Sequence, residues 1–77
     1  SFWNAQVEQI HVLPGKKVEL VPRVGDHLIY LGKLEGFEKK LDRLKMFYER
    51  GLSQVGWNKY SRISVEFSNQ IICTRRE

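Results

Sequence analysis

Few side chains in this chain have the chemistry of a catalytic or metal-binding group. The 77 residues hold two histidines, His11 and His27, and a single cysteine, Cys73. A lone cysteine excludes an intrachain disulfide and any zinc site built from cysteines. Its place in a strand-like segment is typical of a small buried hydrophobic side chain. The two histidines are therefore the main candidates for catalytic residues.

The neighbours Asp26 and His27 have the composition of a catalytic acid–base pair. Adjacent residues of a strand point to opposite faces of a sheet, so their side chains do not meet there. We predict a turn aspartate followed by a surface histidine, with no catalytic role for either. His11 is expected on the polar face of another strand, again without a catalytic neighbour.

Glu38 and Asp42 share a helix face one turn apart, a spacing that suits a pair of carboxylate ligands. No histidine joins them, and Lys39 and Arg43 lie beside them, which favours a solvated charged face. The serines include no Gly-x-Ser-x-Gly elbow, and the glycines include no phosphate-binding loop. The sequence therefore predicts a protein that is not an enzyme, with no catalytic residue, metal, cofactor or small-molecule substrate.

The hydrophobic pattern predicts one α+β domain over residues 1–77. Five short runs have the character of strands, and Pro14-Gly15 signals a turn between the first two. Apolar and polar residues alternate in three of the runs, whereas 27–31 is largely apolar on both faces and 71–75 is nearly all apolar or β-branched. Short links between strands imply antiparallel pairing. The predicted fold is an antiparallel β-sheet of order β-β-β-α-β-β with one amphipathic helix packed on one face. We expect strands over residues 6–13, 17–21, 27–31, 62–67 and 71–75, a helix over 36–52, and a helical turn in 1–6.

The predicted helix has one apolar stripe. Its large apolar residues recur at spacings of four, three, four and four, which places them on one side. Met46 points to the opposite side, where it is either idle or a contact to something else. Lys45 and Glu49 lie one turn apart and are expected to pair weakly. The stripe consists of Phe37, Leu41, Leu44, Tyr48 and Leu52.

The chain is basic, with a net charge of +4 and bases concentrated in the helix and at Arg75-Arg76. Such a surface, combined with exposed aromatic rings, suits nucleic acids. Acidic residues interleave with the helical bases, however, so no stripe of one sign forms. A small basic nucleic-acid-binding module is therefore the alternative function, and no nucleic-acid partner is expected under the main interpretation.

The closing strand is the better functional candidate. Ile71, Ile72, Cys73 and Thr74 are nearly all apolar or β-branched, so both faces of this strand are able to make contacts. If the strand is last in the sheet, its free backbone groups can accept a partner strand. The alternative is that one alternating pair, Ile71 with Cys73 or Ile72 with Thr74, is simply core. The pattern leaves both interpretations open.

Five stretches, taken in order along essentially the whole chain, carry a family resemblance. They are Phe2–Ile10, Lys17–Gly32 with its Pro22-Arg23-Val24-Gly25 turn, Phe37–Tyr48, Gly56–Tyr60 and Asn69–Thr74. The set resembles the extracytoplasmic β domain of the FtsQ/DivIB cell-division proteins, especially those of the Bacteroidetes. The chain would then be the distal part of that β domain. An upstream POTRA domain and membrane helix would be absent from it.

The resemblance implies a non-enzymatic role in the divisome, the assembly that carries out septation. It implies a single-pass inner-membrane protein with this domain on the periplasmic side. The implied partners are FtsB and FtsL, bound when a strand of FtsB adds to the sheet edge at the C-terminal strand. The implied partner-binding residues are Ile71, Ile72, Cys73, Thr74 and Arg75, flanked by Trp57 and Tyr60.

Overall fold

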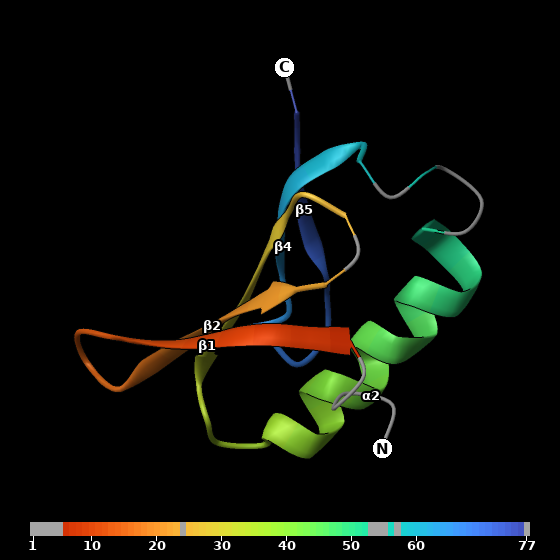
Figure 1. The fold of residues 1–77 in the computed structure, drawn as a ribbon. Coiled ribbons are helices and arrows are strands. Elements are labelled where there is room, and N and C mark those ends of the chain that lie inside the picture. Colours follow the sequence, from red (N-terminus) through yellow and green to blue (C-terminus); the bar gives the residue numbers. More distant parts are fainter. Residues whose placement is uncertain (1–5, 24, 53–55, 57, 77) are drawn as a thin grey trace.

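The computed structural model describes residues 6–23, 25–52, 56 and 58–76, and these form one five-stranded sheet with a helix beside it (Figure 1). The predicted helical turn in residues 1–6 lies outside the described residues, apart from Gln6. The elements are β1 (Val7–Leu13), β2 (Lys17–Pro22), β3 (Leu28–Lys33), the α-helix α2 (Phe37–Phe47), the π-helical turn η1 (Tyr48–Leu52), β4 (Tyr60–Ser64) and β5 (Ile72–Arg75).

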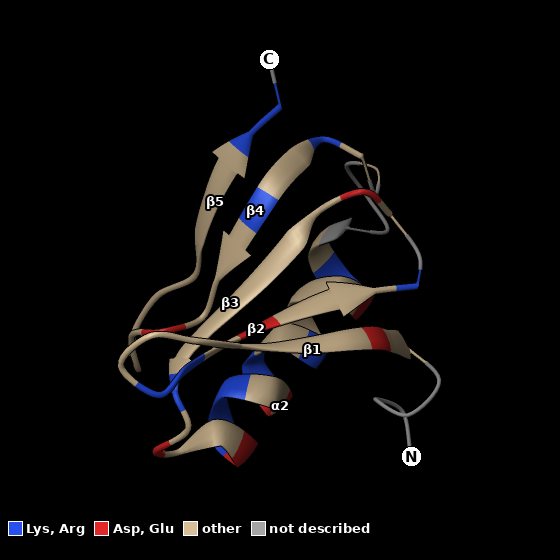
Figure 2. Cartoon of the chain, turned by 60° about the vertical axis from the view of Figure 1, so that its left-hand side comes forward, with Lys and Arg blue, Asp and Glu red and all other residues tan. Residues whose placement is uncertain are grey.

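The sheet is mixed rather than antiparallel. Its strands lie side by side in chain order, β1-β2-β3-β4-β5 (Figure 2). β3 and β4 run parallel, and every other neighbouring pair is antiparallel. The prediction was wrong at this one place because β3 and β4 are joined by α2. A helix that crosses a face of the sheet returns the chain to the end from which β3 started, so β4 runs in the same direction. The α+β class and the order β-β-β-α-β-β are confirmed.

The core lies between one face of the sheet and the helix formed by α2 and η1. Alternate residues of β2, β3 and β4 point towards the helix, as the two-residue period of a strand requires. Leu44 of α2 has no exposed surface and lies at the centre of this layer. The buried apolar cluster consists of Val18, Leu20, Ile29, Leu31, Leu44, Tyr48, Ile63 and Val65.

Burial is uneven among the described residues of the predicted helical stripe. Leu44 and Tyr48 are buried and Leu41 is half-buried, whereas Phe37, at the first turn of α2, is 44% exposed. The side chain of Leu52 lies outside the described part of the chain. Among these residues, burial therefore decreases from Leu44 and Tyr48 towards the start of α2.

Two finer predictions had different outcomes. The pair of Lys45 and Glu49 is confirmed, with Nζ and Oε1 4.0 Å apart. The placement of Phe67 in a half-buried strand was wrong, because β4 ends at Ser64 and Phe67 is 48% exposed. An apolar residue that continues an alternating pattern past the end of a strand has no sheet to place it on the inner face.

β3 contains a bulge at Gly32. Val18 of β2 faces Gly32 and the next residue, Glu19, faces Tyr30, so β3 holds one residue more than β2 at this point. Gly32 has a φ of 72°, in the left-handed region that favours glycine. A methyl group at this position would lie 2.9 Å from Cγ of Glu66. Glycine thus lets the side chain of Glu66 lie directly over the backbone of β3.

Candidate functional site

β5 lies at one edge of the sheet and pairs on its other side with β4. Within the described residues, no strand pairs with its outer side. The backbone groups that point outward from β5 are therefore available to another chain. The sequence left open whether the closing strand lies at the sheet edge. The structure shows that it does.

The two faces of β5 differ, which decides between the two alternating pairs. Cys73 and Ile71 are half-buried and pack against the core cluster. Ile72 is 45% exposed, and Thr74 and Arg75 are exposed too. Burial raises the pKa of the Cys73 thiol above its usual value, so it stays neutral near pH 7. The inner pair anchors the strand, and the outer residues face solvent.

Of the two predicted flanking residues, one is described. Tyr60 is half-buried, packs against the core cluster and faces Arg75 across the β4–β5 ladder. Its ring lies 6.5 Å from the ring of Phe47. Tyr60 therefore supports the inner side of β5 rather than presenting a ring at the edge. Trp57 lies outside the described residues.

A shallow hollow of about 370 Å³ lies on the helix side of β5, between α2 and the turn that precedes the strand. Met46, which the sequence assigned to the far side of the helix, forms part of its wall and is 49% exposed. The remaining lining residues are Arg43, Phe47, Ser68, Asn69, Gln70 and Ile71. Side chains of a segment lying along β5 have apolar surface to contact in this hollow.

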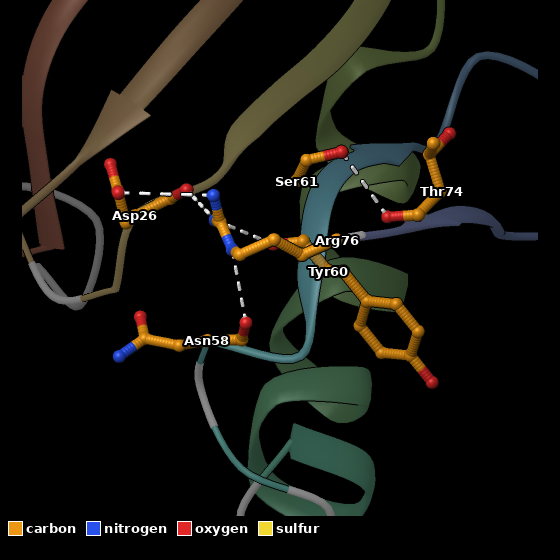
Figure 3. A network of polar contacts seen from close by, with 6 residues as sticks. All are labelled: Asp26, Asn58, Tyr60, Ser61, Thr74 and Arg76. Atoms are coloured by element: carbon orange, nitrogen blue, oxygen red, sulfur yellow. Dashed lines mark hydrogen bonds and ion pairs between the residues drawn. The ribbon is translucent and has the colours of Figure 1, made fainter.

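Arg76 ties the end of β5 to two other loops, as Figure 3 shows. Its side chain donates hydrogen bonds to the carbonyl oxygens of Asn58 and Tyr60, each 3.1 Å away, and to that of Asp26. Sequence reasoning treated Arg76 only as one of two basic residues at the chain end. No local signal identifies these acceptors, because they are backbone atoms distant in sequence.

His27 is a buried residue, and the prediction of a surface histidine was wrong. It is 3% exposed, and its Nε2 lies 2.8 Å from the hydroxyl oxygen of Tyr48. Burial raises the pKa of Tyr48 above its usual value. The residue immediately before β3 points towards the helix, which places His27 beside the core. By contrast, His11 is exposed, as predicted, and contacts the side chains of Gln9 and Glu19.

A hollow of about 830 Å³ is lined mainly by charged residues near the start of α2. Lys40 is only 9% exposed and donates to the carbonyls of Leu31 and Lys33, 3.0 and 2.6 Å away. Arg43 binds the carbonyls of Val65 and Gln70 in the same way. Both side chains therefore bind backbone carbonyls, of β3 for Lys40 and of the segment after β4 for Arg43, instead of forming a free basic surface. Basic and acidic residues interleave along α2 (Figure 2).

No group of three metal-ligating side chains is found among the residues that the structure describes. Glu38 and Asp42, the candidate carboxylate pair, are both exposed. Their exposure agrees with the solvated charged face that the sequence favoured.

β1 is the second edge of the sheet. Ile10 and Val12 are 66% and 76% exposed, and a hollow of about 370 Å³ separates them from Leu34 and Phe37 at the start of α2. This hollow is lined by apolar side chains. The sheet thus has two open edges within the described residues, and each borders a hollow on the helix side.

The fold and these surfaces together define a small α+β domain whose candidate sites are sheet edges. The family model described as FtsQ/DivIB, C-terminal related, matches residues 1–74. The chain therefore belongs to the FtsQ/DivIB C-terminal related family. Comparison with curated proteins gave no significant match, and neither did comparison with solved structures.

Membership makes this chain a cell-division domain whose partners are other division proteins. The FtsQ/DivIB proteins are non-enzymatic scaffolds of septation, anchored in the membrane with a periplasmic domain. In the described part of this chain, no helix combines the length and apolar character needed to cross a membrane.

Proposed function

We propose that this domain binds another division protein by adding a strand of that partner to the free edge of β5. The observation that carries the proposal is the position of β5 at the sheet edge, with Ile72 and Thr74 facing solvent and Cys73 anchored inward. An added strand would complete the backbone hydrogen bonds of β5, and its alternate side chains would contact the two faces.

Side chains beside β5 supply the contacts that make such an addition specific. On the outer face, Thr74 lies beside Arg62, whose guanidinium carbon is 4.5 Å from the centre of the Tyr30 ring. On the inner face, the hollow next to Met46 offers apolar surface. Backbone pairing would supply much of the affinity, and these pockets would select the partner.

The proposed partner is a protein of the FtsB/FtsL type, with the FtsB-type segment forming the added strand. The proposed contact residues are Ile71, Ile72, Cys73, Thr74 and Arg75. Tyr60 supports the strand from within, and Trp57 is proposed as a flanking contact residue. In this proposal the chain is the distal part of the β domain of a single-pass inner-membrane protein. It lies in the periplasm and has no catalytic activity of its own.

The test compares two variants of β5 with a matched variant at the other edge. Ile72→Glu places a charge on the solvent-facing side of β5, and Thr74→Pro removes the backbone N–H of residue 74. Val12→Glu places the same charge at the edge of β1. We expect the β5 variants to lower the affinity for the periplasmic segment of an FtsB-type protein by at least tenfold, and Val12→Glu to leave it unchanged.

Affinity would be measured by titration calorimetry on variants whose circular dichroism matches that of the unmodified chain. Full binding by a folded Ile72→Glu variant would show that β5 is not the docking edge. A loss confined to Val12→Glu would move the site to β1.

A further inference from the structure

Arg76, the residue after β5, joins the end of that strand to two other segments of the chain. Its backbone N–H donates to the carbonyl of Lys59, 3.0 Å away. Its guanidinium donates to the carbonyls of Asn58, Tyr60 and Asp26. One terminal nitrogen also lies 3.8 Å from a carboxylate oxygen of Asp26. The end of β5 is thereby joined to the loop before β4 and to the turn before β3.

The geometry of this contact needs an arginine. Three of the acceptors are backbone carbonyls that lie around one planar group, and a guanidinium presents its donors in a fixed fork that can reach several at once. The ammonium of a lysine would not reproduce that fork. The carboxylate of Asp26 contributes little, because its side chain is 92% exposed and the ion pair is long.

Apart from its pairing with β4, the C-terminal end of β5 has few constraints among the described residues. The strand has four residues, and its ladder with β4 shifts register between Tyr60 and Arg62, beside the end of β5. Ser61 adds one long hydrogen bond, 3.4 Å, from its hydroxyl to the carbonyl of Thr74. The guanidinium contacts of Arg76 therefore add a second constraint on the last residues of this edge, besides the ladder pairs of Thr74 and Arg75 with β4.

From these contacts we infer that Arg76 is a positioning residue, which holds the free edge of β5 extended and ready to accept a partner strand. The inference rests on the proposed function and adds a residue outside the predicted contact set. An edge that is already extended loses less conformational entropy when the partner binds. If removal of the guanidinium leaves the edge extended for only about a tenth of the time, the apparent affinity falls about tenfold.

The first experiment needs no partner. Amide hydrogen exchange is measured by NMR for Arg76→Ala, Arg76→Lys and the control Arg50→Ala, which removes the same charge from an exposed position in η1. We expect both Arg76 variants to speed exchange about tenfold at the β5 amides that bond to β4. Amides of Ile29 and Ile63 in the core strands should change much less. Uniform acceleration in all strands, or none in β5, would overturn the inference.

The second experiment measures affinity for the FtsB-type periplasmic segment with the same variants and with Ile72→Glu. We expect Arg76→Ala and Arg76→Lys to bind about tenfold more weakly, while Arg50→Ala binds normally. Because lysine keeps the charge, its failure to restore binding would separate positioning from charge attraction. If Ile72→Glu abolishes binding and Arg76→Ala binds as the unmodified chain does, only the role of Arg76 is refuted. If Ile72→Glu binds normally, the proposed function itself fails.

Discussion

Replacement of Gly32 by alanine tests how much the glycine in the β3 bulge contributes to stability. Gly32 has a φ of 72°, and an alanine methyl group there would lie 2.9 Å from Cγ and 3.1 Å from Oε2 of Glu66. Two separate costs follow. The first is the backbone strain of a side chain in the left-handed region, and the second is the displacement of the Glu66 side chain.

The two costs have different sizes. A left-handed conformation costs a residue with a Cβ atom about 1–2 kcal/mol. Displacing the partly buried side chain of Glu66 costs roughly 1 kcal/mol, at the low end of the range for overpacking. We therefore expect Gly32→Ala to lower the free energy of unfolding by about 2–3 kcal/mol. For a domain of this size, that loss lowers Tm by roughly 10–20 °C.

A double-mutant cycle separates the costs by chemical denaturation. Glu66→Ala removes Cγ, so Gly32→Ala combined with Glu66→Ala should recover about 1 kcal/mol relative to the sum of the single variants. Gly15→Ala is the matched control, because Gly15 has a φ of 81° and its nearest neighbour would be 3.9 Å from the new Cβ. It should cost the strain alone, about 1–2 kcal/mol.

Two results would refute this reasoning. Strict additivity in the cycle would mean that the contact with Glu66 carries no cost. Full recovery in the double variant would mean that the left-handed backbone at Gly32 carries none.

Two further predictions concern the core. Leu44→Ala, at a position with no exposed surface, should lower the free energy of unfolding by about 2–5 kcal/mol, whereas Met46→Ala, on the exposed side of α2, should cost under about 1 kcal/mol; equal costs in urea melts would contradict the assigned core. Tyr48 has a raised pKa in the folded state, so its contribution to stability is complete below the pKa of an unfolded tyrosine, about 10, and is lost as the pH rises above that value. Unfolding measured between about pH 8 and 11 should therefore show a shallower alkaline loss in Tyr48→Phe, and identical slopes would count against this account.

Local patterns in the sequence predicted the elements well where the chain has a clear period. The alternation in residues 17–22 and the stripe around Leu44 and Tyr48 each depend on neighbours within one or two turns of the same element. The same rule failed at Phe67, where the alternation continues but the strand has ended. It also failed at His27, whose burial depends on where the helix lies and not on its neighbours in sequence.

The candidate site was predictable in part. The apolar and β-branched composition of residues 71–74 made the closing strand a candidate contact surface, and the family resemblance led to the hypothesis that a partner binds there. The composition did not indicate which alternating pair is core, since both contain residues that can be buried. Contacts with the core cluster place Ile71 and Cys73 inside and leave Ile72 and Thr74 outside.

By itself, the sequence determined the element types, their order and the family, because these depend on periodicity and on ordered local motifs. Only the tertiary structure decided that β3 and β4 are parallel neighbours, that β1 and β5 are the edges, and that Arg76 joins three segments. These features depend on pairings between residues as far apart as Asp26 and Arg76. The acceptors in these long-range hydrogen bonds are largely backbone carbonyls, which every residue possesses and no sequence pattern distinguishes.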